Sequence, residues 1–254
     1  MKKILFFLLF VSSIASAQML ATTGIVASTV NWATPQSTTL LPLNGANTST
    51  VCIDYGITPK TWTAHGNAQI STTQSEFSGA SAYFDGTGDY FDTPANADFN
   101  FGSGDFTIDF WMRADDVTRG SEIAGGEGAI YDRTTASFRI GLTGTSRVYW
   151  QVYSGTNITP SVESGVLSSA TWYHIACIVY NNKIFFYING VATGSGITIT
   201  GTSVNNSIGT LSVGTFGAYL PLTNFAGYID EFRITKGLAR WTSNLVPPVL
   251  AYPY

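Results

Sequence analysis

Apolar and polar side chains alternate with a period of two in almost every readable stretch of this chain. The stretch FTIDFWMR (106–113) places one apolar set on a single face, formed by Phe106, Ile108, Phe110 and Met112. RVYWQVYS (147–154) divides in the same way and brings together Val148, Trp150 and Val152. Successive side chains of a β-strand point to opposite faces, so this period predicts strands that bury one face.

The predicted strands are short and follow one another at fairly even spacing. WYHIACIVY (172–180) and KIFFYINGV (183–191) flank Asn181 and Asn182, a pair that tolerates positive φ, and therefore predict a hairpin. No run of ten or more residues carries a convincing helical stripe. Short strands separated by turn residues indicate an all-β fold, either a sandwich or a closed sheet.

The first residues indicate export. Lys2 and Lys3 precede the apolar run ILFFLLFV, and Ala15 and Ala17 hold the small-residue positions of a cleavage site, as in a secretory signal peptide. The run is much shorter than the ~20 apolar residues that span a bilayer, so a retained membrane anchor is the less favoured alternative. We predict a signal peptide at 1–17 and a secreted or cell-surface protein with no membrane span after cleavage.

Two further segments flank the region of clear strand pattern. Residues 18–37 form either a leader segment or a first edge strand. Residues 246–254 contain three prolines, which cannot donate to a β-ladder, and are predicted to lie as an extended C-terminal tail outside the sheets.

Charge and cysteine content narrow the classes of partner and bond. Only 11% of the residues are charged, the net charge is −4, and no basic stripe occurs, which argues against a nucleic-acid partner. Export permits a disulfide between Cys52 and Cys177. Cys177 lies in an apolar strand, however, where a free thiol serves equally well as a small buried hydrophobe, so both states remain open.

Four stretches, in this order, resemble the laminin-G-like, concanavalin A-like lectin/glucanase jelly-roll family: SAYFDGTGDYF, FGSGDFTIDFWMR, WYHIACIVYNNKIFFYINGV and GYIDEFRITKGLARW. The similarity extends over residues 38–245, which we predict as one LamG-like jelly-roll domain. The resemblance implies an antiparallel two-sheet β-sandwich. It also implies a module that binds glycans or proteins, often with a calcium ion, although function must still be argued from sites.

The resemblance places calcium between an Asp or Asn near the start of the domain and an acid in its final strand. The matching positions are Asp54 and Asp230, and Asn67 would add an amide oxygen. Calcium takes six to eight oxygen ligands. Tyr55 and Gly56 replace the small polar residues of the usual loop, so the alternative is that Asp54 and Asp230 only cap turns. The acids of FDGTGDYFD (84–92) lack the EF-hand spacing and are explained as a hairpin turn.

The acids of the final strand argue against catalysis. Glycoside hydrolysis needs two carboxyls about 5 Å or about 6.5–9.5 Å apart. Asp230 and Glu231 are adjacent, so regular alternation would put them on opposite faces. Ile229 and Phe232 do not fit that alternation, so we expect either a bulge or an edge position near Asp230, which would lift its carboxylate to the rim and leave Glu231 to pair with Arg233. No G-x-S-x-G nucleophile elbow occurs either.

Aromatic and polar side chains gather on the faces opposite the predicted core. One strand contributes Asp109 and Trp111, and another contributes Tyr149, Gln151 and Tyr153. Aromatic faces stack on sugar rings and a few polar groups hold the hydroxyls, so these five residues form the predicted ligand site. The alternative is that loops cover this face or that it is ordinary sheet surface.

These patterns predict an exported, non-catalytic binding module for a carbohydrate or another extracellular ligand, with calcium as a candidate cofactor. Three alternatives remain open. The first is an adhesin or structural surface module that recognises protein, the second a divergent carbohydrate-active enzyme, and the third a virion-associated module.

Overall fold

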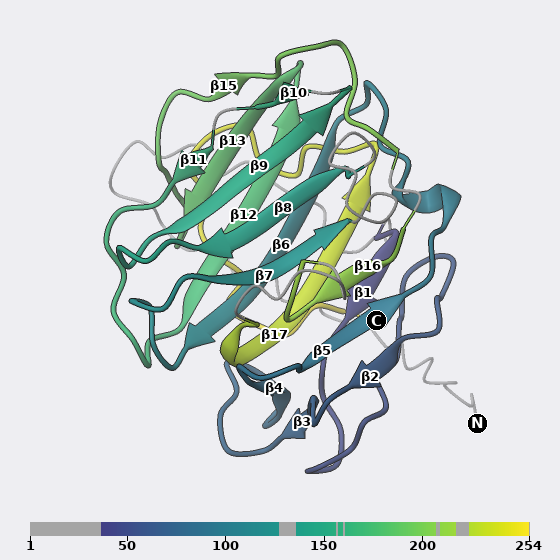
Figure 1. The fold of residues 1–254 in the computed structure, drawn as a ribbon, viewed down its shortest axis with the longest axis vertical. Helices are drawn as coiled ribbons and strands as arrows, with labels where there is room; N and C mark the ends of the chain where they lie inside the picture. The colour runs from purple at the N-terminus through teal and green to yellow at the C-terminus, as the bar shows by residue number, and fades with distance from the viewer. Residues whose placement is uncertain are drawn as a thin grey trace, which may run out of the picture.

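Two antiparallel β-sheets pack face to face in a computed structural model that describes residues 37–126, 136–155, 157–159, 161–206, 209–216 and 224–253 (Figure 1). The predicted signal peptide and residues 18–36 of the leader segment lie outside these residues. Within the described part of the chain, the regular elements are strands and one short 3-10 turn, Ala97–Phe99. The prediction of an all-β, two-sheet sandwich is therefore confirmed.

One sheet has nine strands among the described residues: β1 (Thr39–Leu41), β3 (Gln69–Ser71), β4 (Ser81–Asp85), β6 (Phe106–Ala114), β12 (Tyr173–Tyr180), β13 (Lys183–Ile188), β14 (Val191–Ala192), β15 (Ile197–Thr198) and β17 (Ala226–Lys236). Its order is β14-β13-β12-β6-β17-β4-β3, while β1 pairs with β17 and β15 with β13. The two longest strands, β6 and β17, lie side by side near its centre.

The other sheet has eight strands in the same described ranges: β2 (Thr63–His65), β5 (Tyr90–Thr93), β7 (Ser121–Gly126), β8 (Phe138–Leu142), β9 (Val148–Ser154), β10 (Asn157–Ile158), β11 (Val162–Glu163) and β16 (Leu211–Val213). Its order is β10-β9-β8-β7-β16-β5-β2, and β11 pairs with β9.

The core lies between the two sheets and is built from the alternate residues that the sequence pattern selects. Phe106, Ile108 and Phe110 of β6 are fully buried, as is Trp150 of β9. The rings of Phe106 and Trp150 meet edge to face across the sandwich, with centroids 6.1 Å apart. Burial of such large rings is the main stabilising contribution of a β-sandwich core.

The connection at Asn181 and Asn182 confirms the predicted hairpin. Both residues have positive φ, 49° and 57°, and Tyr180 pairs directly with Lys183. The predicted hairpin in FDGTGDYFD is wrong, because β4 belongs to the nine-stranded sheet and β5 to the eight-stranded sheet. This segment crosses from one sheet to the other, and the Asp89 carboxylate braces it by accepting from the Asp85 amide at 2.8 Å.

A β-bulge interrupts β17 after Asp230, where the broken alternation had left a bulge or an edge position open. Asp230 pairs with Trp111, but Arg233 already pairs with Asp109, so Glu231 and Phe232 together lie opposite one residue of β6. Glu231 adopts a left-handed backbone conformation, with φ 53°. The bulge lets both Ile229 and Phe232 face the core.

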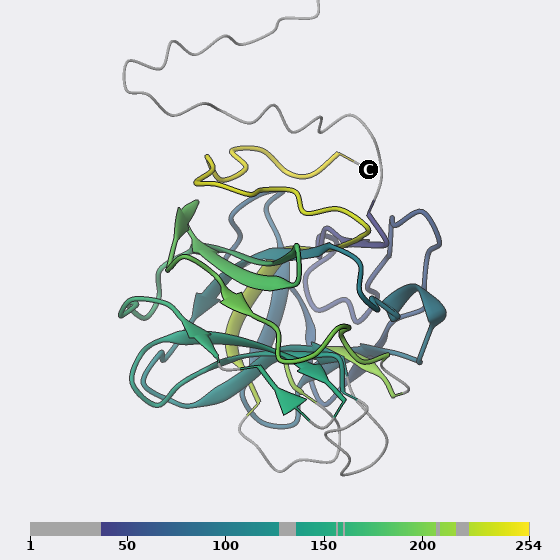
Figure 2. The ribbon, with the colours of Figure 1, turned by 90° about the horizontal axis from the view of Figure 1, so that it is seen from above.

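The closing segment, residues 238–253, forms no described strand and lies as a third layer over the nine-stranded sheet (Figure 2, yellow). Its backbone contacts include Arg240 N to Thr107 Oγ1 at 3.0 Å and Leu245 N to Gly190 O at 2.9 Å. The tail residues thus lie outside the sheets, although Tyr252 is only 2% exposed.

Cys52 and Cys177 are both buried free thiols, so the open question of a disulfide is answered against it. Burial raises the pKa of each thiol and favours the protonated form. None of the helical turns in the described part of the chain is long and apolar enough to cross a membrane.

Candidate functional site

The five predicted ligand residues do not form one patch. Asp109 and Trp111 lie on β6 of the nine-stranded sheet, whereas Tyr149, Gln151 and Tyr153 lie on β9 of the eight-stranded sheet. All five point away from the core, and the outer faces of two packed sheets look in opposite directions. Alternation predicted the correct side of each strand but could not predict which sheet the strand joins.

The outer face of the nine-stranded sheet carries a buried ion pair instead of an open site. Arg233 Nε and Nη2 donate to the two Asp109 oxygens at 3.0 and 2.7 Å. His174 Nε2 lies 3.6 Å from Asp109 Oδ2. Burial alone would raise the pKa of Asp109, but the charge and hydrogen bonds of Arg233 hold it well below its usual value.

Tyr252 of the closing segment seals this ion pair. Its ring lies over the Arg233 guanidinium, 3.7 Å from the ring centre, and its hydroxyl donates to Asp109. Its backbone amide donates to Glu231 Oε2 at 3.0 Å. Asp109 is therefore fully buried and Trp111 only 8% exposed, so neither is open to a ligand while the segment is in place.

Asp230 and Glu231 share this outer face, so the prediction that they lie on opposite faces is wrong. The bulge supplies the reason, because the extra residue breaks the two-residue alternation. Asp230 is also fully buried and does not reach the rim. Its Oδ2 accepts from the amides of Glu76 and Phe77 at 3.0 and 2.9 Å. Arg233 pairs with Asp109 and not, as predicted, with Glu231.

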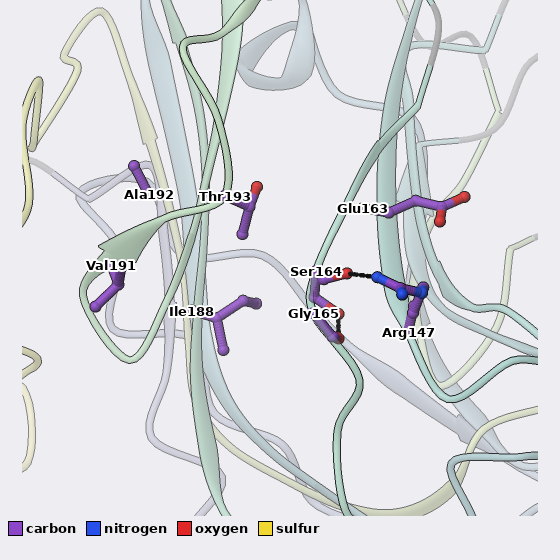
Figure 3. A pocket seen from close by; sticks show the side chains of 8 residues that line it. All are labelled: Arg147, Glu163, Ser164, Gly165, Ile188, Val191, Ala192 and Thr193. Carbon is purple, nitrogen blue, oxygen red and sulfur yellow. Dashed lines mark hydrogen bonds between the residues drawn. The ribbon is translucent and has the colours of Figure 1, made fainter.

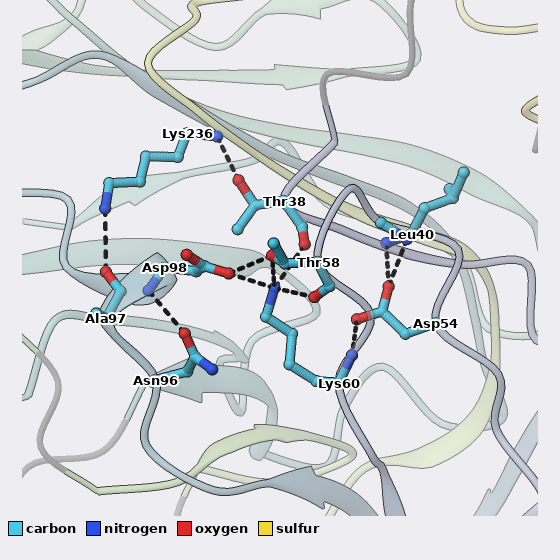
Figure 4. Close-up of polar contacts among 10 residues, drawn as sticks. Thr38, Leu40, Asp54, Thr58, Lys60, Asn96, Ala97, Asp98 and Lys236 are labelled. Atoms are coloured by element: carbon cyan, nitrogen blue, oxygen red, sulfur yellow. Dashed lines mark hydrogen bonds and ion pairs between the residues drawn. The ribbon is translucent and has the colours of Figure 1, made fainter.

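The three predicted metal ligands each form hydrogen bonds with different partners and do not converge on one point. Asp54 accepts from the backbone amides of Leu40, Gly56 and Lys60 at 2.9, 2.8 and 3.1 Å (Figure 4). The Asn67 side-chain amide donates to Asp85 at 2.6 Å, and Asp230 binds the loop at residues 76–77. Among the described residues, no three His, Cys, Asp or Glu side chains cluster as a metal site.

The backbone amide of Lys60 donates to Asp54, while its ammonium group lies among oxygens of Asp98, Thr58 and Thr38 (Figure 4). Lys60 Nζ contacts Asp98 Oδ2 at 2.7 Å, Thr58 O at 2.6 Å, Thr58 Oγ1 at 2.8 Å and Thr38 O at 2.9 Å. Four oxygens thus surround one nitrogen. Asp54 already accepts three backbone amides, and oxygens of Asp98, Thr58 and Thr38 hold an ammonium, so these residues as arranged do not fit a calcium ion.

The outer face of the eight-stranded sheet holds a polar and aromatic array built on three neighbouring strands. Glu122 lies on β7, Arg139 on β8 and Tyr149 on β9. Arg139 Nε donates to Glu122 Oε2 at 2.9 Å, and Arg139 Nη2 donates to Glu122 Oε1. The Tyr149 hydroxyl lies 2.8 Å from each oxygen of the same carboxylate.

Aromatic rings frame the guanidinium group of this array. The Arg139 guanidinium carbon lies 5.1 Å from the centre of the Tyr149 ring and 5.7 Å from that of Phe216. The Phe216 and Tyr153 rings are nearly parallel, with centroids 6.3 Å apart. Gln151 pairs with Arg139 across the ladder and is partly exposed.

Two glycines make room for these rings. A Cβ at Gly125 would lie 2.1 Å from the Phe216 ring, and one at Gly141 would lie 2.6 Å from the Tyr149 hydroxyl. Both distances are far below van der Waals contact, so only glycine lets the side chains lie close against the sheet.

The charges of the array compensate each other. Burial works to lower the pKa of Arg139, but hydrogen bonding to Glu122 and its charge raise the pKa above its usual value. Burial, followed by the Glu122 charge, raises the pKa of Tyr149. The Arg139–Glu122 ion pair and the neutral Tyr149 hydroxyl leave an array with little net charge. Arg139, Tyr149 and Gln151 are its partly exposed members, and Glu122, Tyr153 and Phe216 are buried behind them.

Of the residues in this array, sequence reasoning selected Tyr149, Gln151 and Tyr153 and did not select Glu122, Arg139 and Phe216. Arg139 stands between Phe138 and Ile140 in an otherwise apolar strand, and a lone charge in such a position signals an outward polar contact. No local signal joins it to Glu122, because the contact depends on the pairing of β7 with β8.

A groove of about 390 Å³ opens elsewhere, between β11 and the β13–β14 hairpin (Figure 3). Arg147 and Ser164 line one wall, where Arg147 Nη1 donates to Ser164 O at 2.7 Å, and Ile188 and Val191 line the other. None of the predicted ligand or metal residues lines it.

Several solved structures are similar to this fold. The binding domain of botulinum neurotoxin serotype G matches with a TM-score of 0.61 and 14% identity, over 80% of this chain and 49% of that domain. The binding domain of Paraclostridial Mosquitocidal Protein 1 matches with a TM-score of 0.61 and 19% identity, over 80% of this chain and 50% of that one. The botulinum neurotoxin serotype D ligand-binding domain, solved in complex with N-acetylneuraminic acid, matches with a TM-score of 0.59 and 15% identity. The match covers 81% of this chain and 49% of that one.

The chain therefore spans about half the length of these toxin domains. At such low identity, the similarity establishes the fold alone. No curated protein sequence matches the chain. The family profile described as "Concanavalin A-like lectin/glucanases superfamily" matches residues 85–239. This match covers more than half of the chain, and we conclude that the chain belongs to the concanavalin A-like lectin/glucanase superfamily.

Proposed function

We propose that this chain is an exported, non-catalytic binding module that takes a carbohydrate on the outer face of the eight-stranded sheet. The observation that carries the proposal is the Glu122–Arg139–Tyr149 array with its flanking rings. Sugar-binding surfaces combine aromatic faces with a few oriented polar groups, and this face presents both on rigid strands.

The charge balance of the array favours a neutral glycan. Arg139 is the cation of this array, and its guanidinium is paired through two hydrogen bonds with Glu122. An anionic sugar would have to compete with that carboxylate, whereas sugar hydroxyls can use the remaining guanidinium N–H groups and the Gln151 amide.

The array argues for binding and against hydrolysis. Glu122 is its one carboxylate, and the ion pair with Arg139 engages it. Hydrolysis needs an acid and a second carboxyl across the glycosidic bond. The similar toxin domains are named as binding domains, which agrees with a binding role. One of them binds N-acetylneuraminic acid, but this chain matches only half of that domain, so its ligand is not transferred.

Binding by this array needs no metal, because the predicted calcium ligands Asp54, Asn67 and Asp230 lie apart from it and hold other groups. The signal peptide predicted at 1–17 supports an extracellular glycan as the partner.

A glycan array probed with the intact protein, with and without EDTA, tests the proposal. We expect binding to at least one neutral glycan, unchanged by EDTA, and roughly tenfold weaker binding for Tyr149→Ala, because truncation of a central aromatic residue typically costs more than 1 kcal/mol. Tyr149→Phe, which keeps the ring, should lose less. Silence on all glycans would overturn the proposal, as would equal binding by Tyr149→Ala.

A second candidate, protein recognition, is favoured by one observation. Val51, Ile53 and Ile57 are 62%, 56% and 62% exposed and alternate with buried residues, so they form an apolar stripe with Tyr55 along an extended segment. Exposed apolar surface of this kind marks interaction sites. The variant Ile53→Ser should leave glycan binding unchanged and serves as the control for Tyr149→Ala.

A further inference from the structure

The closing segment behaves like a bound peptide more than like part of the sandwich. Residues 238–253 add no described strand to either sheet. They contact the nine-stranded sheet at three anchor points: around Arg240, around Asn244 and Leu245, and at Tyr252. The sheet beneath them consists of regular strands whose pairing does not use the segment.

Tyr252 is recognised through each of its parts. The hydroxyl donates to Asp109, the ring lies 3.7 Å from the Arg233 guanidinium, and the backbone amide donates to Glu231 at 3.0 Å. All three partners are ionisable side chains held on β6 and β17. Charge-assisted hydrogen bonds and a desolvated cation–π contact are among the stronger interactions that a peptide side chain can make.

The residues between the last two anchors contribute little. Val246, Val249 and Leu250 are 65%, 76% and 75% exposed, and two prolines follow Val246. Prolines keep this stretch extended before it binds, so less entropy is lost when Tyr252 docks. The stretch acts as a linker between the anchor at Leu245 and the anchor at Tyr252.

The site beneath Tyr252 is built in advance. Asp109, His174 and Arg233 project from the central strands β6, β12 and β17, and two hydrogen bonds that do not involve the closing segment join Arg233 to Asp109. Trp241, at the start of the closing segment, packs on Ala176, Ile178 and Tyr187 and bounds the site, with its ring edge-on to His174 at 5.7 Å. A preformed charged and aromatic pocket of this kind can be vacated and refilled without refolding the sheet.

We propose that this pocket is a peptide-binding site and that it accepts residues 243–253 of a second copy of this chain in exchange for its own, while Trp241 stays packed on the sheet. The sequence of the incoming segment is identical, so every contact at Tyr252 is reproduced between copies. This is the geometry of segment exchange, a low-cost route to association between identical chains. The tethered segment has a high effective concentration, so exchange is limited until the internal anchor is weakened.

A labelled synthetic peptide with the sequence of residues 243–253 tests the site on the full-length protein. We expect it to bind Tyr252→Ala at least tenfold more tightly than the wild-type chain, measured by fluorescence anisotropy, because the variant keeps the pocket and loses its competitor. The same peptide with Ala in place of Tyr, and a scrambled peptide, should not bind. Val249→Ser, changed in the exposed stretch, should behave as wild type.

Two results would overturn the proposal: a folded Tyr252→Ala protein that does not bind the peptide, or equal binding of the scrambled peptide. Amide exchange on the unmodified protein adds a second measurement that requires no variant. The Tyr252 amide should exchange through a local opening, faster than the amide of Phe110 in the core. If both amides exchange only on global unfolding, the segment does not leave its site and exchange does not occur.

Discussion

At the scale of single residues, two buried acids stand out in the bulge of β17. Burial raises the pKa of Asp230 to about 8 and that of Glu231 to about 7. Amide donors to each carboxylate work against this rise but do not cancel it. Such acids favour the folded state when protonated, because a buried carboxylate without a cationic partner is costly.

These shifts predict that Asp230 makes the fold less stable as the pH rises. A folded-state pKa above the unfolded value means that the native state binds more protons between these values, so the contribution is present at low pH and is lost as the pH passes through about 8. Asp230→Asn mimics the protonated acid. Its free energy of unfolding relative to wild type should rise by on the order of 3 kcal/mol from pH 5 to pH 8, measured by urea denaturation.

Comparison with the wild type removes the contribution of His174, whose pKa is lowered, chiefly by burial. Asp116→Asn provides a matched control at an exposed acid. A hydrogen bond from the Thr118 side chain lowers the pKa of Asp116, which is the opposite direction to Asp230. A difference between Asp230→Asn and wild type that is flat across this range would contradict the expected protonation of Asp230.

At the scale of elements, the candidate sugar site depends on close contact among β7, β8 and β9. Gly141 of β8 lies beneath the Tyr149 hydroxyl, and a Cβ there would also meet Ser121 O of β7 at 2.7 Å. The ladder, and not any loop, therefore positions the hydroxyl against Glu122.

We expect Gly141→Ala to lower stability by about 1–3 kcal/mol, since overpacking against backbone cannot relax freely. It should also weaken glycan binding, because Tyr149 is displaced from Glu122. Thermal unfolding and the glycan assay measure these two effects. Gly165→Ala, where no atom lies within 4 Å of the added Cβ, should change neither. Unchanged stability in Gly141→Ala would show that the strands do not approach as closely as described.

At the scale of the whole molecule, the first residues of the domain are tied down by an internal cation. The Lys60 ammonium joins the backbone at Thr38 and Thr58 to Asp98, which precedes Phe99 in the 3-10 turn. Lys60 is nearly buried, with 5% of its side chain exposed, whereas 35% of the Asp98 side chain is exposed.

The midpoint of thermal unfolding should therefore be the same in EDTA and in millimolar calcium. Lys60→Met keeps the aliphatic stem and removes the charge, and we expect it to lower the free energy of unfolding by about 1–2 kcal/mol, with solvent screening at Asp98 limiting the loss. Lys183→Met, at an exposed position on β13, is the matched control. A wild-type midpoint that falls in EDTA would contradict the assignment of Lys60 as the resident cation.

The sequence by itself determined the elements and the buried side of each one. Alternation in 106–113 and 147–154 selected the core residues correctly, because burial of one face is a local property of a strand. The asparagine pair at 181–182 specified its hairpin through local backbone geometry. The broken alternation at Ile229 and Phe232 also indicated an irregularity near Asp230, either a bulge or an edge position, and the structure has the bulge.

Only the tertiary structure decided which outer residues meet and which remain open. The pairing of β7 with β8 joined Glu122 to Arg139, and membership in different sheets separated Trp111 from Tyr149. Docking of the closing segment covered Asp109, a contact between residues 143 positions apart. Such contacts depend on which sheet each strand joins and on the path of the chain after its last strand. Neither property produces a periodic pattern in the sequence.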